Sequence, residues 1–465
     1  MTVIDTPVVK PEKVLGTPRK NEPATELQES GWNRYEKIVF RFFFIYFVLL
    51  AVPLDWNYYG DLFSRDWSSL HVSNLFYAAR YTPKFFSDVP VFLDWAVIAA
   101  IALAGTFVWG VIEPERKEYN TLYYWLRVLI RYRLAAALLA YGFIKFFPQQ
   151  MPWPSISNLN TNYGDLADWK VFSMSTGIVP GYQSFLGLVE ITAALLLLNR
   201  KTALVGAFIV LPFTGNVVLS NLAYEGGEYV YGTLLVSFAL FLVTYDVVRL
   251  YRFGAELNTL PNRYKLTLKE AWQRNSRIAA KLAFIFIFVV LYGYQSYASY
   301  KQGGYQYQTT AGIPGTEGLY NVKEFSVNGE VIPPSRTHSA RWRDVVFEKW
   351  ATLSIRSNEP VTLHSALTEE IRTDDAARDY EFSGNGGRHF YSYTYDEKEK
   401  TLTAVNRADV TDTFQLRFER LSPNTIQLSG RNNEKDFVNI VLEKVDKKYL
   451  LEEAAKNGRR RGLKL

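Results

Sequence analysis

The feature that most constrains this chain is a single change of character near Tyr297. Before it, long apolar and aromatic-rich runs interrupt the sequence. After it, apolar and polar residues alternate, which is typical of half-buried strands in a water-soluble β-protein. The mean hydropathy of -0.08 averages the two parts and hides both. The sequence therefore predicts a polytopic α-helical membrane protein that carries one C-terminal water-soluble β-domain.

The apolar runs are long enough to cross a bilayer as helices, because a transmembrane helix needs roughly 20 mostly apolar residues. About seven runs meet this criterion. The predicted spans are Ile38–Leu54, Val91–Ile112, Leu126–Phe147, Gln183–Leu198, Thr202–Asn221, Val230–Val248 and Ala279–Tyr297.

These spans divide the chain into segments of different character. The predicted segments are a disordered cytoplasmic tail (1–33), two N-terminal transmembrane helices with an aromatic outer loop (34–120), a four-helix membrane unit (121–250), a cytoplasmic basic helix leading into the last transmembrane helix (251–300), the β-domain (301–450) and a basic tail (451–465). In the fourth of these, Thr267 and Glu270 match a capping box and predict a helix start there.

Basic residues mark alternate connections between the spans and so predict their orientation. They crowd the second–third and sixth–seventh connections and the tight turn at Arg200 and Lys201, whereas 148–181 holds only Lys170 and the turn at Gly226–Gly227 holds none. Lys and Arg are enriched in cytoplasmic loops. We therefore expect a cytoplasmic N-terminus and a periplasmic C-terminal domain, in the inner membrane of a bacterium.

Composition removes several classes of function. The chain has no cysteine, so disulfides, thiolate metal sites and dithiol redox relays are excluded. Its four histidines all lie outside the apolar runs, which argues against a membrane haem. The net charge of +6 comes from bases beside the spans, and we interpret it as a topology signal and not as nucleic-acid binding. No metal-binding set and no cofactor motif is evident.

Polar residues inside the predicted spans are the candidate site, since ionisable groups are costly in a bilayer. Glu190 lies about seven residues into the fourth span, and Lys145 lies near the outer end of the third, one helical turn after Tyr141. Asn216 and Asn221 lie in the outer half of the fifth span. We expect these residues to converge on a site that opens to the outer face, with Glu190 and Lys145 as catalytic candidates and the others as ligand-binding residues.

A structural interpretation of the same residues stays open and is favoured. Lys145 would then extend to the interface, and Glu190 would be a structural pin, paired with Lys145 or with Arg131 from the other side. The aromatic first outer loop, with Trp56, Trp67 and His71, has a similar pair of interpretations: interfacial anchoring as the default, or a lid over the polar site.

Short motifs around these residues resemble a known family. They are Arg131-Tyr-Arg-Leu-Ala-Ala-Ala, Tyr141-Gly142-Phe-Ile-Lys145-Phe146, Phe185-Leu-Gly187-Leu-Val-Glu190 and Asn199-Arg200-Lys201-Thr-Ala203. Together they resemble the DoxX-like (DoxX/DoxD) integral membrane proteins, a small four-helix family, over about Leu122–Leu250. The resemblance implies a compact four-helix unit in which Lys145, Glu190 and Arg200 are the matching polar positions.

Some members of that family are subunits of thiosulfate:quinone oxidoreductases. The resemblance therefore implies quinone as a candidate substrate or cofactor and a redox subunit as a candidate partner, with Arg131 and Arg200 among the candidate ligand-binding residues. This chain departs from the family pattern by adding two spans before the unit and a span plus a β-domain after it.

Beyond Gly318 the pattern predicts about eight short antiparallel strands, enough for a small closed barrel or a sandwich. The predicted strands are Gly318–Val327, Val345–Arg356, Phe390–Tyr395, Thr401–Asn406, Thr413–Arg420, Thr425–Leu428 and Phe437–Lys444. Asn328-Gly329 predicts a hairpin turn between the first of these and the stretch after Glu330, and the loop 384–387 is predicted to be flexible. The strand order loosely resembles a lipocalin-type barrel.

Such a barrel holds one small apolar ligand or is filled by side chains. Six aromatic residues are candidates for either role, and core packing is favoured. They are Trp342, Trp350, Phe382, Phe390, Tyr391 and Tyr393.

Three functions follow, and they belong to different classes. The first is an accessory or binding protein that presents a β-barrel and binds a lipid or a lipid-soluble molecule. The second is a quinone-linked oxidoreductase subunit in which Glu190 relays a proton and Lys145 stabilises charge on a quinone oxygen. The third is a transporter, although neither broken helices nor an internal inverted repeat is visible in the sequence. Membrane lipids are expected partners in all three.

Overall fold

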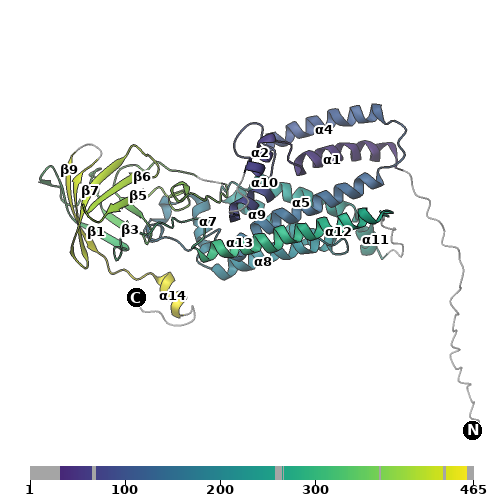
Figure 1. The fold of residues 1–465 in the computed structure, drawn as a ribbon. Coiled ribbons are helices and arrows are strands. Elements are labelled where there is room, and N and C mark those ends of the chain that lie inside the picture. The colour runs from purple at the N-terminus through teal and green to yellow at the C-terminus, as the bar shows by residue number, and fades with distance from the viewer. Residues whose placement is uncertain are drawn as a thin grey trace, which may run out of the picture.

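The structure, a computed structural model, describes residues 32–64, 70–256, 264, 266–365, 368–432 and 436–457. A bundle of long helices and a β-barrel lie end to end, and the C-terminal helix α14 (Leu450–Asn457) follows the barrel (Figure 1). The predicted tails over 1–31 and 458–465, and Trp67, lie outside the described residues.

All the predicted spans are helical, close to the predicted bounds. The helices are α1 (Arg34–Ala51), α4 (Phe92–Ile112), α5 (Asn120–Phe146), α8 (Pro180–Leu197), α9 (Ala203–Ala223), α10 (Tyr229–Thr244) and α12 (Ala271–Ile285), which continues through the π-helical turn η2 (Phe286–Leu291) into α13 (Tyr292–Lys301). Within the described residues, four of these are long and apolar enough to cross a membrane: α4, α8, α9 and the continuous α12–α13. A fifth appears if α10 and α11 (Val247–Gly254), bent by 64°, are one span.

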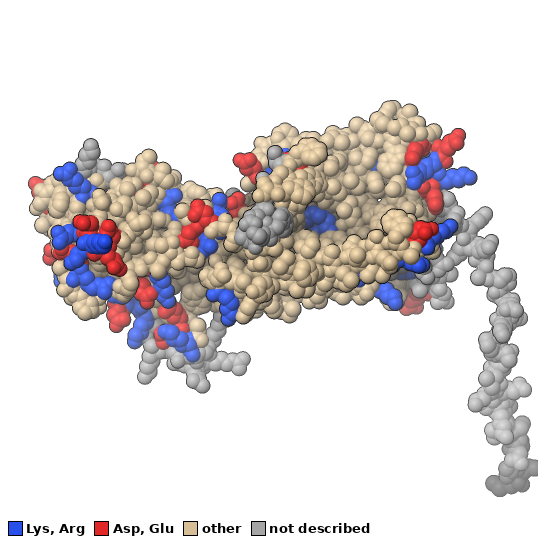
Figure 2. All heavy atoms as spheres, viewed as in Figure 1, with Lys and Arg blue, Asp and Glu red and all other residues tan. Residues whose placement is uncertain are grey.

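The flanks of the helix bundle have the surface of a membrane protein. Lys, Arg, Asp and Glu gather at the end of the bundle remote from the barrel, at the junction and on the barrel, whereas the flanks between are almost free of charge (Figure 2). A hollow below α1 and α4, in which basic atoms are visible, interrupts the apolar flank. Large apolar side chains are exposed on α4, including Leu103 at 63% and Phe107 at 75%. The helices therefore belong to a membrane-associated protein.

The segment predicted to be the first outer loop packs against the helix bundle. It forms α2 (Trp56–Ser64) and α3 (Val72–Ala79), and α3 packs against α5 and α13. Leu75, Phe76 and Ala79 are almost fully buried there, and the Phe76 ring lies 5.3 Å from that of Tyr141. The sequence could not show this, because a segment of eight residues is too short to be identified as a membrane element.

The connection before the last span differs from the prediction. α12 begins at Ala271, and Glu270 is its N-cap residue, with no capping hydrogen bond from the side chain. The prediction of a capping box at Thr267 and Glu270 was therefore wrong, because both residues precede the first turn of α12. Among the described residues of this connection, α11 and the first part of α12 are helical, and α12 leads into the last predicted span.

The C-terminal sheet is an eight-stranded antiparallel barrel, and not a sandwich, because its first and last strands pair. The strands are β1 (Gly318–Val327), β2 (Glu330–Val331), β3 (Asp344–Phe347), β4 (Thr352–Arg356), β5 (His389–Asp396), β6 (Thr401–Asn406), β7 (Thr413–Ser422), β8 (Thr425–Arg431) and β9 (Phe437–Lys444). The short β2 extends only the β1 hairpin, whose turn is confirmed by positive φ at Asn328 (50°) and Gly329 (88°). The predicted strand over 345–356 is split into β3 and β4.

Side chains fill the interior of the barrel. Tyr391 and Tyr393 are buried in this core, and Trp342 packs against its edge. Trp350, Phe382 and Phe390 are not part of this core: the Trp350 ring stacks on Tyr307 at 4.6 Å, and Phe382 packs on His364 and Phe390. The aromatic-core interpretation therefore holds for three of the six aromatic candidates.

Candidate functional site

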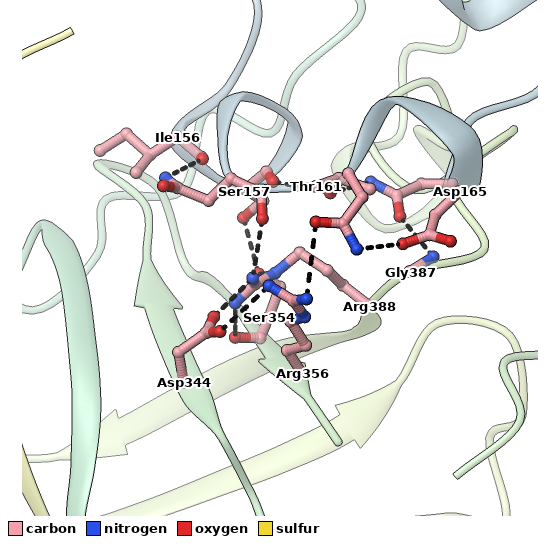
Figure 3. A network of polar contacts seen from close by, with 12 residues as sticks. Ile156, Ser157, Thr161, Asp165, Asp344, Ser354, Arg356, Gly387 and Arg388 are labelled. Atoms are coloured by element: carbon pink, nitrogen blue, oxygen red, sulfur yellow. Dashed lines mark hydrogen bonds and ion pairs between the residues drawn. The ribbon is translucent and has the colours of Figure 1, made fainter. Parts of the chain in front are cut away.

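The barrel docks on the helices through two buried polar contacts, of which the first uses the connection between α5 and α8. This connection forms α6 (Ile156–Leu159), η1 (Tyr163–Asp165) and α7 (Asp168–Gly177). The Ser157 amide and hydroxyl both donate to Glu348 Oε1 at 2.7 Å, and Ser354 donates to the Ser157 hydroxyl at 2.8 Å (Figure 3). The fully buried Arg388 donates to Asp344 at 2.6 Å and to Ser354 at 2.7 Å.

The loop 384–387, predicted to be flexible, is part of this dock. Gly384 has a φ of +70°, and a Cβ there would lie 2.8 Å from the Trp169 ring. Its carbonyl accepts a hydrogen bond from the Ala167 amide at 2.8 Å, and Asn385 donates to Thr161 at 2.8 Å. The glycines therefore allow close approach of backbone and rings and do not mark a mobile loop.

Lys170 is fully buried in the same dock, although its position suggested only a topology signal. Its ammonium donates to the carbonyls of Tyr380 and Glu381 and lies 3.9 Å from the centre of the Tyr380 ring. Burial lowers the pKa of Lys170 to about 7 and raises the pKa of the Glu381 carboxyl to about 8. These groups are enclosed between the two domains, and we assign them a structural role.

The second contact inserts residues 368–371 of the barrel domain between the ends of the helices that face the barrel. Arg80, after α3, forms an ion pair with Glu228 at 2.6 Å and donates to the Glu369 carbonyl at 3.0 Å. The Glu369 amide donates to Glu228 at 2.9 Å. Ile371, 3% exposed, packs in the helix core, and its amide donates to the Tyr77 hydroxyl at 3.1 Å.

The Glu369 carboxylate completes this contact. It accepts hydrogen bonds from the Tyr305 hydroxyl, from Gln150 Nε2 at 3.0 Å and from Gln306 Nε2 at 3.3 Å. Burial raises the pKa of Glu369 to about 7, and the hydrogen bonds from Tyr305 and Gln150 oppose that rise. The junction therefore holds a carboxyl group that titrates near neutral pH.

Some of the residues predicted from the sequence do come together. Lys145 and Glu190 form a buried ion pair of 2.5 Å, and the Lys145 ammonium lies 5.6 Å from the centre of the Tyr141 ring. Tyr141 donates to Glu228 at 2.8 Å, and Asn221 accepts from the Glu228 amide at 3.2 Å. Glu228 thus links the predicted residues to the barrel contact.

The other predicted residues lie apart from this pair. Arg131 donates to the carbonyls of Leu197 at 2.9 Å and Leu198 at 3.3 Å, so it caps the C-terminus of α8 and does not pair with Glu190. Arg200 donates to the Tyr264 carbonyl near the same end of α8. Asn216 is exposed on α9. A single site holding all of these residues is therefore not formed.

The structure also contains a cavity of about 810 Å³ beside the second contact, here called the junction cavity. Its apolar floor includes Leu49 of α1 and Ile98 and Ile101 of α4, and segment 368–370 contributes Thr368 and Glu370 to its wall. Because Ile101 is nine residues into α4, the floor reaches about 14 Å along that helix from its N-terminal end.

Polar residues form the rim of the junction cavity. Three tyrosines and five charged side chains contribute: Tyr58, Tyr77, Tyr81, Asp55, Arg80, Lys84, Asp88 and Glu370. None was a candidate site residue from the sequence. The sequence feature nearest to this cavity was the aromatic segment predicted to be the first outer loop, which contributes Tyr58 to the lining.

Comparisons with known proteins leave the family open. No protein-family model matches the chain, and no solved structure matches it. Over 65 residues, 14% of this chain, it is 40% identical to a protein of Bacillus subtilis (strain 168) described as "Uncharacterized protein YwoB". The match spans 42% of that protein, less than half of its length. The DoxX-like resemblance therefore stays a prediction.

Proposed function

We propose that this protein is a multi-pass protein of the bacterial inner membrane that holds its β-barrel on the outer face and binds one lipid or lipid-soluble molecule in the junction cavity. The observation that carries the proposal is the cavity itself, at about 810 Å³, with an apolar floor and a polar rim. Ligand pockets are usually concave, mostly apolar and about 300–1,000 Å³ in volume. Residues of the helices and of the barrel domain both line the cavity, so a bound molecule would contact both domains.

The proposal includes about seven spans, with α1 and α5 completing the set. α5 is long but carries several bases, and each has a place inside the bundle. Arg131 caps α8, Arg133 donates to the carbonyls of Ala79 and Tyr81, Lys145 pairs with Glu190, and the Arg127 guanidinium lies 3.4 Å from the centre of the Tyr245 ring. Intramembrane charges are tolerated when they face the bundle interior and have partners.

The absence of cysteine makes the orientation straightforward to test. Glu397→Cys places a thiol on an exposed turn of the barrel, and Lys117→Cys places one in the connection between α4 and α5. In spheroplasts, a membrane-impermeant maleimide is expected to label Glu397→Cys at once and Lys117→Cys only after the membrane is opened. The reverse pattern would overturn the orientation.

The binding proposal is tested by filling the cavity. Ile101→Trp places a large ring in the floor, whereas Leu103→Trp changes the same helix at a position that does not line the cavity. Molecules that co-purify with each variant are then identified by native mass spectrometry. We expect the wild type and Leu103→Trp to retain a bound molecule and Ile101→Trp to lose it. Equal retention by all three would remove the junction cavity as the binding site.

One observation supports a second candidate function, a quinone-linked oxidoreductase subunit similar to those of thiosulfate:quinone oxidoreductases. Among the described residues, Glu190 Oε2 is buried and has no hydrogen-bond partner, so it is an acceptor open to a proton. In this reading, Glu190 relays the proton and Lys145 stabilises charge on the quinone, with a redox subunit as partner. The closed 2.5 Å pair of Lys145 and Glu190 favours the structural interpretation instead.

A further inference from the structure

The length of the last predicted span places its basic end at a membrane surface. α12, η2 and α13 form one continuous helix, Ala271–Lys301, of 31 residues. Between Lys281 and Lys301 this helix carries no charged side chain. The 20 residue steps between the two lysines correspond to about 30 Å, which is the thickness of the hydrocarbon core of a bilayer. With Lys301 at the boundary that faces the barrel, Lys281 therefore lies at the opposite boundary (Figure 1).

Basic residues follow one face of α12 from that boundary outward. Arg274, Arg277 and Lys281 are three and four residues apart, so they share a face of the helix. All three are exposed, and none of them forms an ion pair or a side-chain hydrogen bond with the residues that the structure describes. From Glu270 to Lys281 the sequence holds these three bases and one acid, Glu270. This face is therefore positively charged.

Two pairs of aromatic rings fix the register between α5 and the last helix. Near the barrel, the ring of Phe147, directly after α5, lies 6.3 Å from that of Tyr300. Farther from the barrel, the Tyr132 ring lies 4.9 Å from the Phe284 ring. The two contacts are 15 residues apart along α5 and 16 along the last helix, so the two helices run parallel in a nearly constant register.

This register brings Arg127 of α5 to the depth of the basic face of α12. Arg127 lies five residues before Tyr132, which is level with position 279, between Arg277 and Lys281. The charge of Arg277 acts on Tyr132, so the basic face lies close to α5 there. Below that contact α12 leaves the bundle, since every residue of 271–283 except Gln273 is exposed. A headgroup can therefore reach both helices.

The Arg127 guanidinium has unused capacity for an anion. It lies 3.4 Å from the centre of the Tyr245 ring, and its Nε is buried with no hydrogen-bond partner among the described residues. Stacking on a ring leaves the N–H groups at the edge of a guanidinium free to bind a phosphate. Asp246, whose charge acts on Arg127, is also paired with Arg249 at 3.5 Å, and Arg200 adds positive charge nearby.

Apolar side chains continue from the basic face into the hydrocarbon region. Leu282, Phe286 and Val290 lie on successive turns of the last helix and are 61%, 59% and 54% exposed. A molecule held at Lys281 by an anionic group would therefore have an apolar surface beside it. A phospholipid has this combination of groups, whereas a soluble anion would leave the apolar surface unused.

We propose that the end of the bundle remote from the barrel binds an anionic phospholipid of the phosphatidylglycerol class. Its phosphate lies between Arg127 and the basic face of α12, at Arg277 and Lys281, and its acyl chains run along Leu282 and Phe286. Basic clusters at the end of a transmembrane helix attract anionic lipids, and Lys and Arg are visible at this end of the molecule (Figure 2). The lipid joins α12 to α5 where the protein itself makes little contact.

The test measures the binding of defined lipids to the delipidated full-length protein by native mass spectrometry. Phosphatidylglycerol is expected to bind more tightly than phosphatidylcholine, which has the same chains and no net charge. The double variant Arg277→Gln, Lys281→Gln should bind phosphatidylglycerol about 30-fold more weakly, because each base near a membrane surface contributes about fivefold. The matched double variant Arg336→Gln, Lys398→Gln removes the same charge from exposed positions of the barrel domain and should bind as the wild type does.

Several results would overturn this proposal. They are equal affinity of the wild type for the two lipids, unchanged affinity of Arg277→Gln, Lys281→Gln for phosphatidylglycerol, and an equal loss in both double variants. Glycerol 3-phosphate carries the phosphate without acyl chains, and binding of this compound as tight as that of the lipid would assign the site to a soluble anion. Arg274→Gln, with an expected loss of about fivefold, gives a second reading if the first double variant does not fold.

The same measurements in Ile101→Trp separate this site from the junction cavity. Ile101 lines the cavity and is remote from α12, so the preference for phosphatidylglycerol should persist in that variant even if the cavity has lost its own ligand. Loss of the preference in Ile101→Trp would place the anionic lipid in the junction cavity and overturn the site at Arg127 and α12. A preference that persists supports this site whether or not the junction cavity binds a molecule.

Discussion

Arg80 and Glu228 form an ion pair of 2.6 Å at the point where three separate parts of the chain meet. Arg80 follows α3, Glu228 precedes α10, and both bind the backbone of Glu369, which belongs to the barrel domain. The side chains of the pair are only 11% and 15% exposed. Water therefore has little access to the pair, which forms part of the second contact between the barrel domain and the helices.

Removing either member should therefore destabilise the protein strongly. Arg80→Ala and Glu228→Gln are each expected to lower the free energy of unfolding by about 3–5 kcal/mol, since each leaves a buried charge without its partner. Thermal or denaturant unfolding in detergent measures the loss. Glu113→Gln is a matched control, because Glu113 pairs with Arg116 at 3.0 Å with both side chains more than a third exposed. Losses of equal size in all three variants would contradict this prediction.

Glu369 should make stability depend on pH. Its pKa is about 7 in the folded protein against an ordinary 4.5, so between these values the folded state holds a proton that the unfolded chain has lost. The stability that this carboxyl contributes is therefore complete below pH 4.5 and is lost as the pH rises to about 7, by at most about 3 kcal/mol.

The comparison of wild type with Glu369→Gln isolates this effect. Glu381 and Lys170 also have shifted pKa values, but both remain in the variant and cancel in the difference. Melting temperatures between pH 4.5 and 7 are expected to fall more steeply for the wild type than for Glu369→Gln. Parallel curves would show that Glu369 does not titrate in this window.

The long helices could be predicted from their apolar runs, and the strands from their alternation of apolar and polar residues. The predicted bounds of β1, β6 and β9 match the structure, as does the Asn328-Gly329 turn. The short helix α3 and the inserted Ile371 could not be found this way. They are buried by residues distant in the sequence, on α5 and at the barrel-facing ends of the helices, and local periodicity cannot indicate such contacts.

Only part of the candidate site could be predicted, because only some of its residues stand out from their local sequence. Glu190 and Lys145 stood out because charges are rare in apolar runs, and the structure pairs them. Arg80, Glu228 and Glu369 lie in connections, where a charged residue is ordinary, so nothing in the sequence distinguished them. Their role follows from the docking of the barrel domain on the helices.

The packing of α5 on α8 gives a further prediction. A Cβ at Gly187 would lie 2.3 Å from the Phe146 amide nitrogen and 2.4 Å from the Gly142 carbonyl oxygen, so the two helices would have to separate. Small residues permit such close contact in membranes. Gly187→Ala is expected to destabilise by about 1–3 kcal/mol, as overpacking typically does. Gly181→Ala, on the same helix with no atom within 4 Å of the new Cβ, should be neutral. Equal melting temperatures for the two variants would contradict the close contact.

The Lys145–Glu190 pair separates a structural role from a redox role. If the pair is a structural pin, Glu190→Gln leaves the buried Lys145 charge unpaired and lowers stability by about 3–5 kcal/mol. The double variant Lys145→Met, Glu190→Leu should then recover most of that loss, because it replaces both charges with apolar groups of similar size. We expect this result, since the two charged atoms lie 2.5 Å apart and both side chains are buried.

A redox role predicts the opposite pattern in the same two variants. Glu190→Gln would then insert and melt normally but lose reduction of an added quinone analogue in membranes, and the double variant would fold without regaining it. Unfolding and quinone reduction are measured on the same preparations, so neither readout depends on expression level. If Glu190→Gln changed neither stability nor quinone reduction, both roles would be excluded for this pair, and the junction cavity would remain as the candidate site.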